Sequence, residues 1–79
     1  MHAFVLMSVQ PGMERQVLSH LMKLDKVMEA FIIYGQYDLM IEVQADTREE
    51  LWAFIGKEIR VIECARGTLT LLPIHGFKR

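Results

Sequence analysis

The stretch IIYGQYDLM, residues 32–40, breaks an apolar run with the letters GQYD and then resumes it. Only Gly35 and Gln36 separate two apolar, β-compatible runs, residues 27–34 and 37–45, and two residues is the spacing of a tight β-hairpin. Glycine supplies the positive φ that such turns often require. This stretch therefore predicts two antiparallel strands joined directly, with no helix between them.

A strand and a helix are predicted before this hairpin. Residues 2–10 are rich in apolar side chains and stop at Pro11-Gly12, as a buried strand does before a turn. Apolar residues then recur at helical spacing from Met13 until Asp25 interrupts the pattern. The first half of the chain therefore has the order strand, helix, strand.

A second helix and a fourth strand are predicted after the hairpin. Asp46 or Thr47 can cap this helix, because a glutamate follows either residue three positions later. Apolar residues keep the helical period to about Glu63, and the run TLTLLPI at residues 68–74 forms the last strand. The complete order is βαββαβ.

This order predicts an α+β, ferredoxin-like fold. Right-handed crossovers place both helices on one face of a four-stranded antiparallel sheet and leave the other face bare. In the first strand Ala3 and Val5 point to one face and Phe4 and Leu6 to the other, so both faces are apolar. Because sheets covered on one face normally alternate apolar with polar residues, the bare face is expected to pack against the sheet of a second copy.

The predicted third strand is less apolar on one side. There Met40 alternates with Glu42 and Gln44, while Leu39 and Ile41 point the other way. We expect the polar side of this strand to lie near the rim of the contact between the two copies.

Composition points to a single domain, residues 1–79, that gains stability by association. Hydrophobic residues make up 52% of the 79 residues, and Cys64 is the only cysteine, so an intramolecular disulfide is excluded. The net charge is −1 and the basic residues are scattered, which gives no positive face for direct nucleic-acid binding. No apolar stretch approaches the ~20 residues that span a bilayer and no secretory leader is present, so a soluble cytoplasmic protein with no membrane partner is expected.

Catalytic and metal-binding patterns are not found. His2, His20 and His75 fall in three different elements without the spacing of a zinc site. Cys64 has no adjacent histidine to activate it. We therefore predict no catalytic residue, metal or cofactor, and we do not expect an enzyme.

A candidate binding site lies at the hairpin. Gly35 lets a ligand approach the backbone closely, Gln36 offers an adaptable amide, and Asp38 has the charge to bind an ammonium group. Thr68 and Thr70 add hydroxyls on one side of the last strand. The alternative is an ordinary hairpin in which Asp38 accepts local backbone hydrogen bonds.

Three segments together carry a resemblance to a known family: VMEAFIIYGQYDL at residues 27–39, DTREEL at 46–51 and IRVIECARGTLTL at 59–71. In order and spacing they resemble the ligand-binding domain of the Lrp/AsnC family of feast/famine transcriptional regulators, also called the regulation-of-amino-acid-metabolism (RAM) domain. The resemblance covers nearly the whole chain.

The resemblance implies a ferredoxin-like fold, homodimers formed through the sheets, and often four such dimers in a ring. It also implies small effectors, commonly amino acids, that bind between dimers near the Gly-x-Tyr-Asp loop. Carried over to this chain, the effector-binding positions are Tyr34, Gly35, Gln36, Tyr37, Asp38, Thr68 and Thr70.

The chain departs from the family pattern at several positions. Tyr34 replaces a small polar residue before the glycine, and Cys64-Ala65 replaces a Gly-Val pair, which bears on pocket size and effector choice. The resemblance covers only the ligand-binding domain, so we expect the stand-alone form, without the N-terminal helix-turn-helix DNA-binding domain of full-length members.

Three functions remain open from the sequence. The first is an effector-binding and oligomerisation module that senses an amino acid or a related metabolite and modulates a full-length Lrp/AsnC-type regulator by mixed assembly. The second is a small dimeric ferredoxin-like enzyme with a pocket between sheet and helices. The third is a structural assembly domain with a vestigial ligand site.

Overall fold

The computed structural model describes residues 1–79. Its elements are β1 (His2–Val9), α1 (Glu14–Leu21), β2 (Val27–Ile32), β3 (Leu39–Gln44), α2 (Arg48–Phe54), the π-helical turn η1 (Ile55–Ile59) and β4 (Ala65–Leu71). The predicted βαββαβ order is confirmed, and η1 continues α2 without a break. Neither helix has the length and apolar character needed to cross a membrane.

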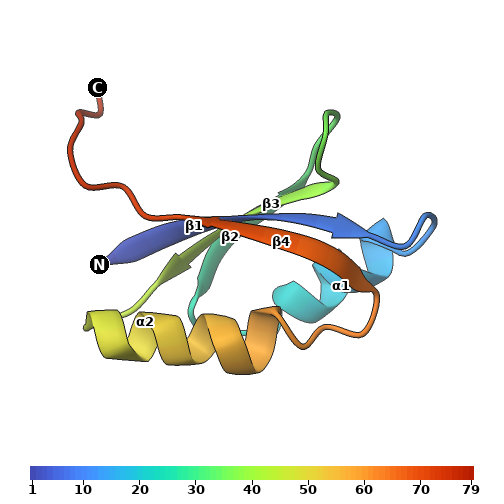
Figure 1. The fold of residues 1–79 in the computed structure, drawn as a ribbon, viewed down its shortest axis with the longest axis horizontal. Coiled ribbons are helices and arrows are strands. Elements are labelled where there is room, and N and C mark those ends of the chain that lie inside the picture. Colours follow the sequence, from blue (N-terminus) through green and yellow to red (C-terminus); the bar gives the residue numbers. More distant parts are fainter.

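The four strands form one sheet in the order β2-β3-β1-β4, with every neighbouring pair antiparallel. Both helices cover the same face of this sheet, and the opposite face is left open (Figure 1). This is the ferredoxin-like arrangement, and it follows from two right-handed crossovers that each place a helix on the same side.

The core lies between the sheet and the two helices. All thirteen buried residues are hydrophobic. The sheet contributes the alternate residues of the central strands, such as Val5 and Ile41, which are directly paired across β1 and β3. The helices contribute Leu21, Leu51 and Ile55, which have at most 1% of their surface exposed.

The start of α2 shows why the helix begins where it does. The Thr47 hydroxyl accepts a hydrogen bond of 3.1 Å from the backbone N–H of Glu50. Of the two predicted caps, the structure therefore uses Thr47. This bond satisfies one of the donors that the first turn of a helix leaves free.

The open face of the sheet is apolar, as predicted. Phe4, Leu6 and Met40 lie on the central strands, and the outer strands add large side chains that are close to half exposed: Phe31 47%, Leu69 43% and Leu71 45%. The sheet therefore presents a second hydrophobic surface that the two helices of this chain do not cover.

The polar side of the third strand lies on the open face of the sheet. Because β3 is a central strand, Glu42 lies inside the open face, between Phe4 on β1 and Glu29 on β2. There its Oε2 atom lies 3.0 Å from Nδ1 of His2.

The predicted two-residue hairpin is wrong. β2 ends at Ile32 and β3 begins at Leu39, so residues 33–38 form a longer connection. The N–H of Ile33 donates to the carbonyl of Asp38 at 2.9 Å and closes this loop at its base. Gly35 does not adopt a positive φ, because a longer loop reverses direction without the strained conformation that a two-residue turn needs.

Other boundaries shift by a few residues. The first helix ends at Leu21, and the last strand runs from Ala65 to Leu71 rather than over residues 68–74. This strand starts earlier because β1 pairs with it as far back as Ala65, through a bulge at Ser8/Val9. It ends before Pro73, which has no N–H to donate to a neighbouring strand.

Candidate functional site

A charged cleft of about 360 Å³ lies at the end of the sheet where β1 finishes and β3 begins. Its lining residues come from the turn after β1, the first turn of α1 and both sides of the β2–β3 loop: Gly12, Glu14, Arg15, Ile32, Ile33 and Asp38. Segments far apart in the sequence meet here because β1 and β3 are antiparallel neighbours.

Asp38 is held in the cleft by three hydrogen bonds. Its backbone N–H donates to the carbonyl of Met7 at 2.9 Å, and its carbonyl accepts from Ile33. Its Oδ2 atom accepts from the backbone N–H of Val9 at 2.9 Å. The carboxylate therefore ties the β2–β3 loop to the end of β1, and its orientation is set before any ligand arrives.

The hydrogen bonds of Asp38 can be compared with the alternative interpretation, an ordinary hairpin in which this residue accepts local backbone hydrogen bonds. The backbone carbonyl of Asp38 accepts the local bond of its own hairpin, from Ile33. Its carboxylate accepts instead from Val9, which is 29 residues away. Its second oxygen, Oδ1, has no hydrogen-bond partner within the chain. A half-buried carboxylate with one free oxygen can accept a further donor.

The turn between β1 and α1 forms the opposite wall. Gly12 has a φ of +89°, the only positive φ in the chain, so this position favours glycine. Met13 precedes α1 without a side-chain capping bond. The first N–H groups of α1 consequently have no side-chain acceptor.

The cleft carries charges of both signs. Arg15 and Glu14 project from the first turn of α1, and Asp38 lies across from them. Arg15 has no acidic partner, since the only side-chain contact in the chain between a basic and an acidic residue within 4.0 Å joins His2 and Glu42. This combination of a free guanidinium with carboxylates matches a small molecule that has one positive and one negative group.

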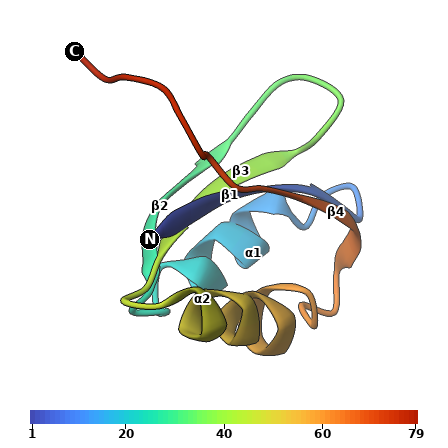
Figure 2. The ribbon, with the colours of Figure 1, turned by 60° about the vertical axis from the view of Figure 1, so that its left-hand side comes forward.

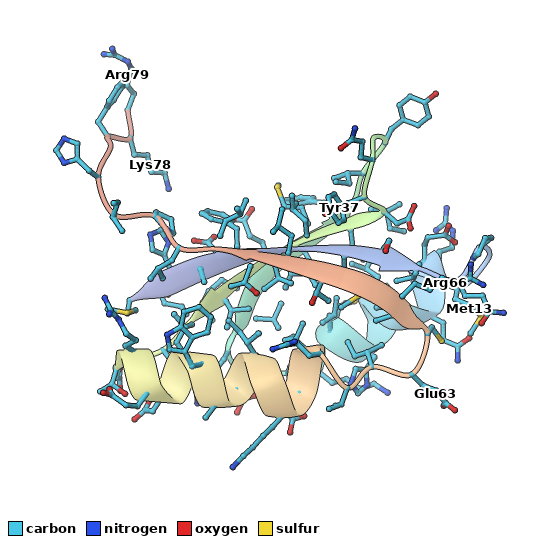
Figure 3. The ribbon with its side chains drawn as sticks, in the orientation of Figure 1. Met13, Tyr37, Glu63, Arg66, Lys78 and Arg79 are labelled. Atoms are coloured by element: carbon cyan, nitrogen blue, oxygen red, sulfur yellow. The ribbon has the colours of Figure 1, made fainter.

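The structure places the predicted site residues of the loop in different environments. Only Asp38 lines the cleft. Tyr34, Gly35 and Gln36 are exposed at the tip of the loop, with Tyr34 fully accessible. Tyr37 is half-buried and lies above the sheet, on the side away from the helices (Figure 3).

Thr68 and Thr70 are not brought to this cleft within one chain. They pair with Met7 and Val5 of β1, so their side chains face the helices. Strands β1 and β3 separate them from β2 and its loop. A site that used both groups of residues would need more than one copy of the chain.

Sequence reasoning missed Gly12, Glu14 and Arg15. Pro11-Gly12 signalled a turn, and the charged pair after it is ordinary for the solvated start of a helix. The available signal was topological. In a βαββαβ fold the end of the first strand lies beside the start of the third, so the turn after residue 10 must approach Asp38.

A second cleft, of about 380 Å³, lies on the helix side between α1 and the segment after η1. His20, Glu58, Glu63 and Cys64 are among its lining residues. No group of three or more His, Cys, Asp or Glu side chains in the chain is placed to hold a metal ion. Of these two clefts, only the one at Asp38 contains a residue of the predicted binding site.

The fold and this site define a class: a ferredoxin-like binding domain with a charged cleft at one end of its sheet and an apolar face open to assembly. The sequence profile of the Lrp/AsnC ligand binding domain matches residues 2–79. The chain belongs to this family of regulatory ligand-binding domains.

Known relatives agree with this assignment. The HTH-type transcriptional regulator FL11 of Pyrococcus abyssi is 32% identical over 78 residues, which are 99% of this chain and 51% of FL11. The chain thus spans about half the length of this relative. The crystal structure of FFRP-DM1 is 38% identical with a TM-score of 0.89, covering 92% of this chain and 97% of that one. The hypothetical protein PHS023 from Pyrococcus horikoshii is 37% identical with a TM-score of 0.88, covering 95% and 90%.

Proposed function

We propose that this chain is an effector-binding and oligomerisation module that senses an amino acid or a related small metabolite. The observation that carries the proposal is the presence of Asp38 and Arg15, with opposite charges and no ion-pair partners, in one cleft of about 360 Å³. That volume is within the range of small-molecule sites, roughly 300–1,000 Å³. Family membership supports a regulatory ligand rather than a substrate.

The cleft favours a particular orientation of an amino acid. Its ammonium group would donate to Oδ1 of Asp38, whose other oxygen is already bonded to Val9. Its carboxylate would accept from Arg15 and from the free N–H groups at the start of α1. Its side chain would then contact Ile32 and Ile33, which favours an aliphatic side chain.

Effector binding would act by changing how copies of this chain assemble. The apolar face of the sheet supports a homodimer, and the exposed loop tip beside the cleft supports contacts between dimers, up to a tetramer of dimers. An effector bound at the base of the loop shifts the balance between assembly states only if it binds one state more tightly. Mixed assembly with a full-length Lrp/AsnC-type regulator would transmit the signal to transcription.

Calorimetric titration of the twenty standard amino acids against the purified chain tests this proposal. We expect one or a few of them to bind, and Asp38→Asn and Arg15→Gln each to weaken binding by at least about tenfold, because each removes a charge-assisted hydrogen bond. Arg66→Gln is the matched control: Arg66 is exposed on β4 and outside the cleft, so binding should be unchanged. Absence of binding by every amino acid contradicts the proposal.

A structural assembly domain with a vestigial ligand site is the second candidate. The bond between Asp38 and the N–H of Val9 favours it, because this bond gives the carboxylate a structural role without any ligand. The same titration separates the two functions. A chain that binds no amino acid, yet loses its assembly in Asp38→Ala, is an assembly domain.

A further inference from the structure

The segment after β4, Pro73–Arg79, leaves the sheet and rises on the open side, opposite to the helices. Both views show this segment and the β2–β3 loop standing above the sheet (Figures 1 and 2). Ile74 is 90% exposed and Phe77 is 82% exposed. Two large apolar side chains on one short segment are thus left out of the hydrophobic core. Within the chain, the ring of Phe77 meets the guanidinium of Arg79, whose Cζ lies 4.9 Å from the ring centroid.

A wide space separates this segment from the sheet. A cavity of about 700 Å³ is lined on one side by His2 and Phe4 of β1 and on the other by residues 73–78. The chain's own atoms do not fill it. The segment, which we call the arm, therefore does not pack on the open face of its own sheet. The space between the arm and the sheet can accommodate part of another polypeptide chain.

The open face and the arm have opposite charges. Glu29 lies directly opposite Glu42 across β2 and β3, and like charges in a cross-strand pair destabilise a sheet. Only His2 contacts this acidic pair within the chain. The arm carries Lys78 and Arg79 (Figure 3), and no acidic residue follows Glu63.

Two stacked sheets would bring these charges together. Leu71, at the base of the arm, lies in the same cross-strand row as Phe4, Glu42 and Glu29. If two sheets face each other about a two-fold axis parallel to the strands, the β4 edge of one copy lies over the β2 edge of the other, at the same level. The arm of each copy then rises beside Glu29 of the partner subunit.

The arm is long enough for this contact. Stacked sheets lie about 10 Å apart, and an extended chain covers ~3.3–3.6 Å per residue. Crossing the gap uses about three residues of the arm. The remaining residues can run over the edge of the second sheet.

We infer that Pro73–Arg79 is an arm exchanged between two copies of this chain. Ile74 and Phe77 cover the apolar rim of the second sheet, and Lys78 and Arg79 pair with Glu29 and Glu42 of the partner subunit. This inference rests on the sheet-to-sheet dimer of the proposed function and adds a contact that sets its orientation. The like-charged pair on the open face, unfavourable in one copy, becomes the binding site for the arm of the other.

Charge reversal tests the exchange. One variant carries Lys78→Glu and Arg79→Glu, and the other carries Glu29→Lys and Glu42→Lys. Each variant alone places like charges at both contacts of its homodimer, so we expect its dimer to dissociate about tenfold more readily than the wild type at low salt, with a smaller difference at high salt. Sedimentation equilibrium over a range of protein concentrations measures this.

Mixing the two variants is the decisive step. In a dimer with one copy of each, both contacts regain opposite charges, so we expect heterodimers with stability within about threefold of the wild type. Native mass spectrometry of the mixture distinguishes heterodimers from homodimers by mass. Circular dichroism of each variant verifies that both remain folded.

Three outcomes overturn the inference. Variants that dimerise as tightly as the wild type show that the arm makes no such contact. A mixture with no preference for heterodimers shows that the arm pairs with its own sheet. Both results leave the proposed function intact when the wild type is dimeric, whereas a wild type that stays monomeric overturns the arm and the sheet-to-sheet dimer together.

Discussion

The two faces of the sheet are built from the same strands but have different environments. On the helix side, Val5 and Ile41 are fully buried. On the other side, Phe31, Leu69 and Leu71 remain almost half exposed. The alternating geometry of a strand supplies two apolar surfaces, whereas the chain has helices for only one of them. The second surface is therefore available for assembly.

The largest effect is expected on the covered face. Ile41→Ala should lower the free energy of unfolding by about 3–4 kcal/mol, because it removes a fully buried side chain and leaves a cavity against the helices. Urea denaturation followed by circular dichroism measures the loss. Leu69→Ala on the open face is the control, and its effect on the isolated subunit should be under about 1 kcal/mol. Equal losses at both positions would remove the distinction between the faces.

On the open face, the effect should appear in association rather than in folding. Phe31→Glu combined with Leu69→Glu should raise the dimer dissociation constant by at least about a hundredfold, or ~2.7 kcal/mol, because the charges must be desolvated in an apolar contact. Sedimentation measures the constant, and circular dichroism should still report a folded chain. Met22→Glu, at the end of α1 on the helix side, should leave the constant unchanged. A double variant that remains fully dimeric would show that the sheets do not form the interface.

A smaller effect is expected where the loop meets the end of β1. Asp38→Ala leaves the N–H of buried Val9 without an acceptor and should cost about 2 kcal/mol of stability. Asp38→Asn keeps an oxygen at this position, so it should lose less than half as much while still weakening effector binding. Thermal unfolding of the three proteins gives the comparison. If both variants are equally unstable, charge rather than the hydrogen bond positions this loop.

The smallest effect is expected at the start of α2, which helps to cover the buried face. Thr47→Ala removes the bond to the N–H of Glu50 and should cost about 1 kcal/mol. Thr47→Ser retains the hydroxyl and should lie within about 0.5 kcal/mol of the wild type. Urea unfolding measures both. A loss in Thr47→Ser equal to that in Thr47→Ala would mean that the methyl group, not the cap, matters.

The candidate site was predictable only in part. Asp38 was identified because an acid in a Gly-x-Tyr-Asp loop is unusual inside an apolar run. Arg15 was not, since a charged residue at the start of a helix is normally solvated and gives no local signal. Thr68 and Thr70 were assigned to the same site, yet they lie on the helix side of another strand. Proximity between distant segments depends on strand order and register, which no single segment encodes.

Much of the architecture was already encoded in the order of residues. The helical and alternating periods, the Pro11-Gly12 turn and the cap at Thr47 act over a few neighbouring residues, so they specified the βαββαβ order and the two apolar faces. Three features depended on how distant segments meet in space: the closure of the loop at Ile33 and Asp38, the charged cleft, and the position of Glu42 between Phe4 and Glu29 on the open face. Local patterns follow from short-range sterics and hydrogen bonding, whereas these contacts exist only after the sheet has assembled in one register.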